Sequence, residues 1–220
     1  MSTDVGGLLD LIRNAILQGE MDSIDAFVAS ALAAGATAED LLNGALAPAM
    51  TLVGEEYERG ERFVPEMLIS AEAMKIALVR LQPLLVASGI EPIGTVVIGT
   101  VEGDLHDIGK DLVAMMFEGA GLRVINLGAE VPATTFVEAA KTHQADIVAL
   151  SALLTTTMIH MRDVVDGLMQ AGLRDHIMVI VGGAPVSESF ARDIGADAYA
   201  ADGASAVRRV RHLLGIQDSR

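Results

Sequence analysis

The apolar positions of the first 88 residues follow helical rather than strand spacing. Apolar side chains recur every three or four residues from Val5 to Gln18, which predicts an amphipathic helix with one buried face. A second helix is predicted to run to about Ala34, with Asp22 or Ser23 as its cap and Gly35 at its end. The chain therefore begins with two helices joined by a short connection.

Helical spacing continues after this point. Thr37 is expected to open a third helix that reaches Tyr57, and Pro48 should bend or interrupt it because proline lacks the N–H of a continuous helix. A fourth helix is predicted from Pro65 to about Val86. Four amphipathic helices with short connections indicate an N-terminal four-helix bundle over residues 1–88. Taken alone, such a bundle is equally typical of a scaffold or a dimerisation module.

The pattern changes after residue 88 to alternating strands and helices. Residues 89–94, which include Gly89, Pro92 and Gly94, are interpreted as a linker. The apolar, β-branched runs predict strands at about Thr95–Val101, Arg123–Leu127, Ile147–Leu153, Met178–Gly182 and Ala198–Ala201. The segments between them predict helices at about Asp107–Glu118, Pro132–His143, Thr157–Ala171, Ser187–Ile194 and Ala204–Leu214. Residues 95–220 are therefore expected to form a flavodoxin-like, Rossmann-type α/β domain with a five-stranded parallel sheet.

Composition narrows the class of protein. The chain has 220 residues and a formal net charge of −15, which argues against nucleic-acid or anionic-membrane binding because those partners need clustered Lys and Arg. It has no cysteine, so disulfides, thiolate metal sites and iron–sulfur ligation are excluded. No apolar run approaches the roughly 18 residues of a membrane span, and no targeting segment is evident. We expect a soluble, cytoplasmic protein.

The first candidate for chemistry is the loop after the first predicted strand. In an open α/β sheet, ligands bind at the carboxyl ends of the strands, where this loop should lie. An imidazole at position 106, with a carboxylate two residues before it and a glycine three residues after it, is typical of a metal-ligating histidine. The loop consists of Gly103, Asp104, Leu105, His106, Asp107, Ile108 and Gly109.

Two further strand ends carry unusual residues. Ser151 places a hydroxyl in the apolar third strand, where it needs a hydrogen-bond partner. That partner could be a bound ligand or, as the alternative, a backbone carbonyl in the protein core. Gly182 and Gly183 end the fourth strand and leave an opening without side chains, which is also typical of an ordinary turn.

These three sites together resemble the signature of cobalamin-binding domains. The pattern consists of Asp104, His106 and Gly109, then Ser151 and Leu153, then Gly182 and Gly183. The stretches 62–68 and 71–74 are similar to the last bundle helix of the same family. The whole chain resembles the small corrinoid proteins of methanol, methylamine and O-demethylase methyltransferase systems, and the cobalamin module of methionine synthase.

The resemblance implies roles for individual residues. His106 would be the lower axial ligand of cobalt in a bound cobalamin or related corrinoid, in the base-off, His-on form. Asp104 would accept the other imidazole N–H, and Thr157 would extend that network. Positions implied to lie along the nucleotide tail or the ring edge are Ser151, Leu153, Thr155, Gly182, Gly183 and Gly203. Candidates for an apolar cap over the upper face are Phe63, Met67 and Met74, for which plain bundle core is the alternative.

The resemblance also implies a function. A corrinoid methyl carrier would receive a methyl group on cobalt from a small donor and pass it to an acceptor such as tetrahydrofolate or a thiol. Its partners would be a substrate-specific methyltransferase, an acceptor methyltransferase and a reductive activator, so the chain would be a non-catalytic or co-catalytic subunit. A cobalamin-dependent sensor is the alternative. A mutase domain is disfavoured by the bundle, and a receiver domain is disfavoured because Ser151 stands where a phosphorylated Asp is required.

Overall fold

The computed structural model describes residues 5–88 and 92–216. The core of the predicted linker, residues 89–91, lies outside the described residues. The chain divides into two compact units, Met1–Pro92 with Glu118–Gly121, and Ile93–Phe117 with Leu122–Arg220. Within the described ranges, no helix is both long and apolar enough to cross a membrane.

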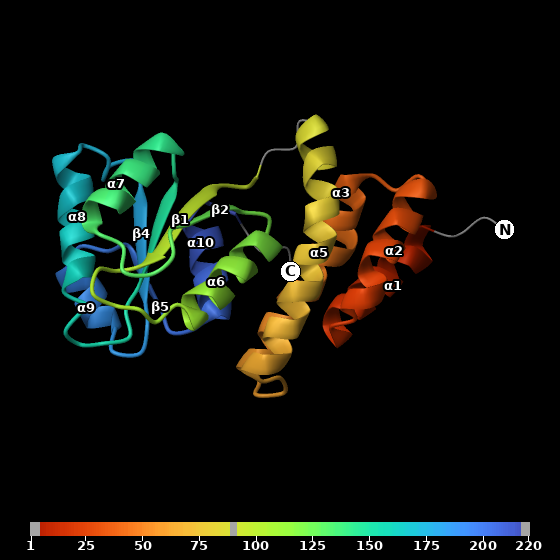
Figure 1. Cartoon of the computed structure of the whole chain (residues 1–220), viewed down its shortest axis with the longest axis horizontal. Helices are drawn as coiled ribbons and strands as arrows, with labels where there is room; N and C mark the ends of the chain where they lie inside the picture. The colour runs from red at the N-terminus through yellow and green to blue at the C-terminus, as the bar shows by residue number, and fades with distance from the viewer. Residues whose placement is uncertain (1–4, 89–91, 217–220) are drawn as a thin grey trace. The chain divides into compact units, whose positions relative to one another are not determined.

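The N-terminal unit is helical, as the spacing predicted (Figure 1). Its elements are α1 (Val5–Gln18), α2 (Met21–Ala33), α3 (Ala38–Leu41), the π-helical turn η1 (Leu42–Leu46), α4 (Ala47–Glu58) and α5 (Val64–Ala87). Its interior is formed by one apolar face of each long helix. Fully buried members of this core include Ile12, Ile16, Ile24, Val28, Leu41, Leu46, Val53 and Leu81.

The start of α2 differs from the prediction. The helix begins at Met21, its first flanking residue is Glu20, and no side chain caps it, so a cap by Asp22 or Ser23 was wrong. The reason lies in the preceding turn, where Gly19 adopts a positive φ of 69° and Glu20 donates its N–H to the Ala15 carbonyl at 2.8 Å. The chain re-enters a helix directly after this turn, before Asp22 is reached.

The long third helix is interrupted as expected. Thr37 caps its start, where the hydroxyl accepts the Asp40 N–H at 3.0 Å and the Asp40 carboxylate accepts the Thr37 N–H at 2.9 Å. The interruption is the single π-helical turn Leu42–Leu46, after which α4 restarts with Pro48 in its first turn. A wider turn placed just before Pro48 accommodates the missing N–H and the bulk of its ring.

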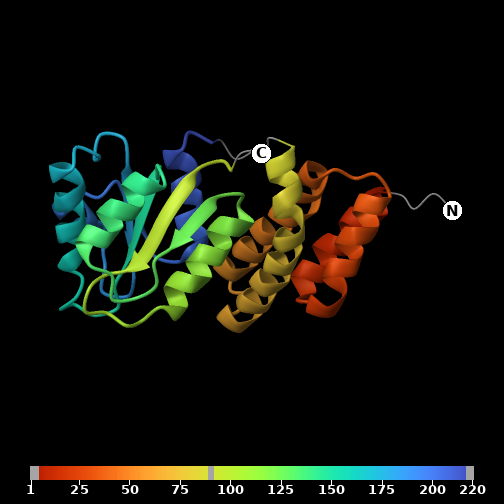
Figure 2. The same cartoon turned by 45° about the horizontal axis from the view of Figure 1, so that its top comes forward.

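The C-terminal unit is a parallel sheet in the order β2-β1-β3-β4-β5 (Figure 2). The strands are β1 (Thr95–Thr100), β2 (Arg123–Asn126), β3 (Ile147–Ser151), β4 (Met178–Gly182) and β5 (Ala198–Ala200). The helices are α6 (Ile108–Gly119), α7 (Ala133–Thr142), α8 (His160–Gln170), α9 (Glu188–Asp193) and α10 (Gly203–Leu213). Helices α7 and α8 lie on one side of the sheet, and α6 and α10 lie on the other. The flavodoxin-like α/β prediction is confirmed.

Candidate functional site

Three neighbouring strands end at the same level of the sheet. Thr100 of β1 pairs with Ser151 of β3, and Ser151 pairs with Gly182 of β4. The segments that follow these residues therefore leave the sheet side by side. The structure thus places the loop of residues 101–107, the segment 152–159 and Gly183 around one edge, as the strand-end argument predicted.

Asp104 is the centre of this edge. Its side chain is fully buried and accepts hydrogen bonds at both oxygens. Oδ1 lies 2.7 Å from His106 Nδ1 and 3.1 Å from the His106 backbone nitrogen. Oδ2 accepts the backbone N–H of Leu153 at 2.7 Å and that of Leu154 at 3.3 Å, and the hydroxyl of Thr157 lies 2.7 Å away. One carboxylate thus joins the loop after β1 to the segment after β3.

The surroundings of Asp104 determine its charge. Burial on its own raises the pKa of this carboxyl, but hydrogen bonds from Leu153, Thr157 and His106 outweigh it and hold the pKa far below its usual range. Asp104 is therefore an ionised group that only accepts hydrogen bonds.

This charge state sets the tautomer of His106. Because Asp104 Oδ1 can only accept, the imidazole Nδ1 carries a proton, and Nε2 keeps its lone pair in the neutral ring. The side chain of His106 is 51 % exposed although its partner is fully buried. His106 is thus oriented with Nδ1 on Asp104, which leaves Nε2 as the ring nitrogen that can bind a metal.

The backbone of the loop is held at several points. The Thr100 hydroxyl donates to the His106 carbonyl at 3.0 Å, and the Asp104 carbonyl accepts the N–H of Glu130 at 2.9 Å. Behind the loop, the buried ammonium of Lys110 donates to Asn126 Oδ1 at 2.8 Å and pairs with the Asp111 carboxylate. Sequence reasoning missed Thr100 and Lys110, because each reads as an ordinary strand or helix residue.

Ser151 makes no side-chain hydrogen bond in the described part of the chain, whereas Gly182 and Gly183 are tightly packed. Within residues 5–88 and 92–216 the Ser151 hydroxyl makes no hydrogen bond, so the structural alternative of a core carbonyl partner is not found. A Cβ on Gly182 would lie 2.9 Å from the Ala200 carbonyl oxygen. A Cβ on Gly183, whose φ is +121°, would lie well under 3.0 Å from the Ala152 carbonyl oxygen. Both glycines are therefore required by the fold itself, whatever else they do.

The remaining predicted residues of the loop after β1 and of the segment after β3 expose apolar side chains. Leu105 and Ile108 are 71 % and 74 % exposed, and Leu153 is 43 % exposed. Thr155 is also exposed, and a Cβ on Gly109 would meet open space. Several exposed apolar side chains in this loop and in the segment after β3 favour a ligand with apolar surface.

Gly203 and the bundle candidates lie in other surroundings. A Cβ on Gly203 would lie 2.5 Å from Met116 Sδ, so this glycine allows α10 to pack closely on α6. In the N-terminal unit, Phe63 is 68 % exposed and precedes α5, whereas Met67 and Met74 are buried. The roles predicted for these four residues at a cofactor stay predictions.

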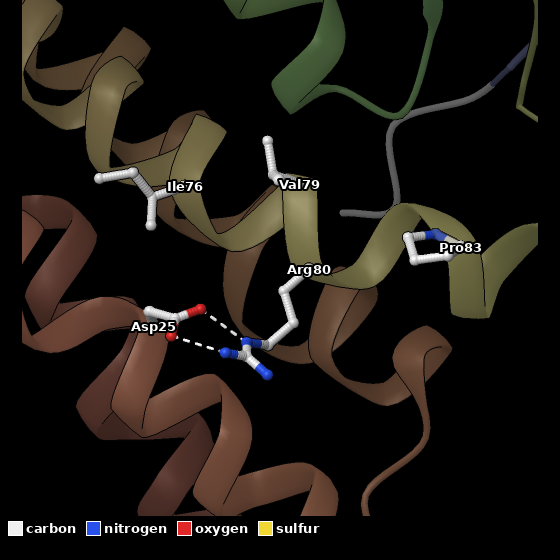
Figure 3. Close-up of a pocket in the computed structure, with 5 residues that line it drawn as sticks. All are labelled: Asp25, Ile76, Val79, Arg80 and Pro83. Carbon is white, nitrogen blue, oxygen red and sulfur yellow. Dashed lines mark hydrogen bonds and ion pairs between the residues drawn. The ribbon is translucent and has the colours of Figure 1, made fainter.

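The bundle has a groove of its own, of about 420 Å³. Figure 3 shows Arg80 of α5 reaching Asp25 of α2 across it, beside Ile76, Val79 and Pro83. The guanidinium donates to both Asp25 oxygens at 2.6 Å, which holds the pKa of this carboxyl below its usual value. Both charges are thus satisfied by each other, and the groove lacks the ligand donors found at the strand ends.

The possible metal ligands at the strand ends fit a metal that is already bound in a macrocycle. Among the described residues, no group of three or more His, Asp or Glu side chains could hold a free ion. His106 offers one ring nitrogen, Nε2, as a donor, and Leu105 and Ile108 of the same segment are exposed. A corrinoid would suit this site, because its macrocycle would supply the other ligands of the metal while His106 would supply one nitrogen donor and Leu105 and Ile108 apolar contacts.

Comparison with known proteins identifies the family. Family models described as B12 binding domain match residues 94–211 and residues 8–82. A corrinoid protein of Desulfitobacterium hafniense is 40% identical over 211 residues, covering 94% of this chain and 98% of that protein. Trimethylamine corrinoid protein 1 of Methanosarcina acetivorans is 44% identical over 186 residues, covering 84% of this chain and 86% of that protein.

Solved structures agree with this assignment. The methanol:cobalamin methyltransferase complex MtaBC from Methanosarcina barkeri contains a chain with a TM-score of 0.85 and 30% identity. The match covers 99% of this chain and 82% of that chain. With a B12-binding model over more than half of its length and relatives of similar length at 40% identity, the chain belongs to the corrinoid proteins with a B12-binding domain.

Proposed function

We propose that this protein is a methyl carrier of a multi-component methyltransferase system, with His106 as the lower axial ligand of a corrinoid cobalt. The bound cobalt supplies the position that accepts and releases the methyl group. The observation that carries the proposal is the network of Asp104, His106 and Thr157, because it fixes His106 Nδ1 on a carboxylate and leaves Nε2 as the ring nitrogen that can bind a metal.

The residues of the network have distinct tasks. Asp104 holds the proton at His106 Nδ1 and orients the ring, and Thr157 with the N–H groups of Leu153 and Leu154 keeps Asp104 ionised. A carboxylate partner also makes the imidazole a stronger base toward a metal. The chain itself thus sets the donor strength of the axial ligand.

The other predicted contacts form part of the same proposal. The exposed side chains of Leu105, Ile108 and Leu153 are suited to the flat face of a macrocycle. The free hydroxyl of Ser151, next to Gly182 and Gly183, suits a polar tail that passes close to the backbone. Proposed further contacts are Thr155 and Gly203 along the tail or ring edge, and Phe63, Met67 and Met74 as an apolar cap.

The partners are inferred from the relatives. Their names refer to trimethylamine, dimethylamine and methanol systems, so we propose a small methylated compound as the donor. A substrate-specific methyltransferase would methylate the carrier, and an acceptor methyltransferase would move the group to tetrahydrofolate or a thiol. A reductive activator would restore cobalt that has been oxidised.

The test is cofactor loading with a matched control. The protein is incubated with hydroxocobalamin, free cofactor is removed, and the absorption spectrum is recorded for wild type, His106→Ala and His160→Ala. His160 is the control because its Nδ1 also lies near a carboxylate, Asp163 Oδ2 at 2.9 Å, but this pair is exposed to solvent. We expect stoichiometric retention by wild type and a spectrum changed by His106→Ala alone. Failure of the wild type to retain corrinoid would refute the proposal.

A further inference from the structure

Thr100 occupies a special place at the end of β1. It is completely buried, and its hydroxyl donates to the carbonyl of His106, six residues further along, at 3.0 Å. Its own backbone is fixed on both sides, since its N–H donates to the Gly128 carbonyl at 2.9 Å and its carbonyl accepts the Val131 N–H at 3.0 Å. Thr100 thus has a fixed backbone in the sheet, and its side chain contacts the backbone of His106.

The backbone of His106, which Thr100 contacts, is held by two hydrogen bonds within the described part of the chain. Residues 104–107 form no regular secondary structure. The His106 N–H is bonded to Asp104 Oδ1, and its carbonyl is bonded to the Thr100 hydroxyl. In the described part of the chain, no other donor reaches that carbonyl. Both sides of the His106 backbone are therefore fixed, one by Asp104 and one by Thr100.

We infer that Thr100 is a positioning residue for the axial ligand: its hydroxyl fixes the His106 backbone so that the imidazole stays on Asp104 with Nε2 free. A Val at this position would keep the β-branched shape and both backbone bonds of the strand, and would lose only the hydroxyl. The His106 carbonyl would lose its one donor from the described part of the chain, which makes the observed conformation less stable, so the loop would sample others. The inference rests on the proposed corrinoid site, because only there does the orientation of His106 have a function.

The test compares Thr100→Val with Thr100→Ser in protein free of corrinoid. Nitrogen-15 NMR of His106 reports which ring nitrogen carries the proton, and hydrogen exchange reports the protection of the His106 amide. In Thr100→Val we expect exchange at His106 to become about five- to tenfold faster, as loss of one hydrogen bond implies, and the Nδ1–H tautomer to be less populated. Thr100→Ser keeps the hydroxyl and should behave as wild type.

A second readout uses the protein loaded with cobalamin and reduced to Co(II). The electron paramagnetic resonance spectrum shows a splitting from a nitrogen bound to cobalt, and nitrogen-15 labelling of histidine changes that splitting only where His106, rather than the base of the cofactor, is the ligand. We expect Thr100→Val to show a smaller share of this signal than Thr100→Ser. Wild type that binds no corrinoid would refute the proposed function, whereas the measurements on corrinoid-free protein test Thr100 by themselves.

The outcomes separate positioning from plain stability. If Thr100→Val lowers the stability of the whole domain but leaves the His106 tautomer and exchange as in wild type, the inference is wrong. If Thr100→Val does not fold, the pair Thr100→Ala and Thr100→Ser replaces it, because these two differ by the hydroxyl alone. Equal tautomer populations and exchange rates in that pair would likewise overturn the role of Thr100.

Discussion

Asp104→Asn tests the site most directly, because it removes the charge and one acceptor from a side chain of unchanged shape. Asp104 accepts from the backbone and ring of His106 at Oδ1, and from Leu153, Leu154 and Thr157 at Oδ2. An amide has one acceptor oxygen and one NH₂ donor. Either the groups that now donate to Oδ1 or those that now donate to Oδ2 must therefore meet the NH₂ group instead of an acceptor. The result depends on which orientation is less unfavourable.

The two orientations of the new side chain differ in what they leave unpaired. With the NH₂ group at the position of Oδ2, the backbone N–H groups of Leu153 and Leu154 would both lose their acceptor. With the NH₂ group at the position of Oδ1, only the His106 backbone N–H is left unpaired, since the ring can change tautomer and accept at Nδ1. An unpaired buried donor costs about 1–3 kcal/mol, so the second orientation is favoured by about one such penalty.

The favoured orientation moves the imidazole proton to Nε2, the atom that binds the metal. We therefore expect Asp104→Asn to fold with about 1–3 kcal/mol less stability and to carry His106 as the Nε2–H tautomer. Coordination of cobalt by His106 should fall by about 10–100-fold, the usual effect of losing a partner behind a metal ligand. Retention of corrinoid through other contacts is expected to persist.

The assay is nitrogen-15 NMR of His106 together with urea unfolding and the spectrum of the cobalamin-loaded protein. Asp163→Asn is the control, because it changes the same pairing at His160 on an exposed surface and should leave stability and spectrum unchanged. If Asp104→Asn keeps the Nδ1–H tautomer and the wild-type spectrum, Asp104 does not set the tautomer of His106.

Three further predictions concern the same domain. Gly183→Ala should lower the free energy of unfolding in urea by more than about 3 kcal/mol or prevent folding, because its Cβ would overlap a carbonyl oxygen. Gly172→Ala is the control, also at positive φ but in open space, and should lower it by only about 1–2 kcal/mol. The depressed pKa of Asp104 means that the unfolded chain binds its proton first as pH falls, so its stabilising contribution is present above about pH 4 and lost below it. Urea unfolding at pH 6 and pH 3 should therefore show a larger acid loss in wild type than in Asp104→Asn. Lys110→Met removes a buried donor to Asn126 and should cost about 1–2 kcal/mol, with faster amide exchange in the first turn of α6.

Much of the fold can be predicted from the spacing of apolar residues and from the glycines at the ends of helices and strands. The limits of α1 and β4 coincide with the predicted Val5–Gln18 and Met178–Gly182, because each apolar run ends at a clear turn. The third strand was predicted to reach Leu153, yet β3 ends at Ser151. The N–H groups of Leu153 and Leu154 donate to the Asp104 carboxylate, so they are not available to extend the strand.

The helix after β3 was mispredicted for the same reason. It was expected from Thr157, but α8 begins at His160. The hydroxyl of Thr157 lies against Asp104 instead, which holds residues 152–159 as an irregular segment. A charge that lies about fifty residues away in the sequence cannot be detected by local pattern. Both errors therefore fall at the site, where one buried carboxylate competes with regular secondary structure for donors.

The sequence indicated the side chains of the site more readily than its supports. His106 and Asp104 have chemistry that stands out in a loop, and resemblance added Thr157. The backbone N–H of Leu154 has no side-chain signature, and Thr100 cannot be told from a β-branched strand residue until its hydroxyl is seen against the His106 carbonyl. Supports of this kind become visible only when hydrogen bonds are followed in three dimensions.

Two hydroxyl groups at and after the end of β3, those of Ser151 and Thr157, differ in their hydrogen bonds. Thr157 lies 2.7 Å from Asp104 Oδ2 and 3.0 Å from the Leu154 carbonyl oxygen, so its single proton is already used within the chain. Ser151 is only half-buried, and in the described part of the chain its hydroxyl has no partner, although it sits beside Gly182 in the sheet. A hydroxyl at a strand end that the fold leaves unused is available to a ligand. We therefore expect Thr157 to act on the histidine and Ser151 on the cofactor, so that Thr157→Val should change the His106 tautomer while Ser151→Ala should weaken corrinoid retention and leave the tautomer as it is.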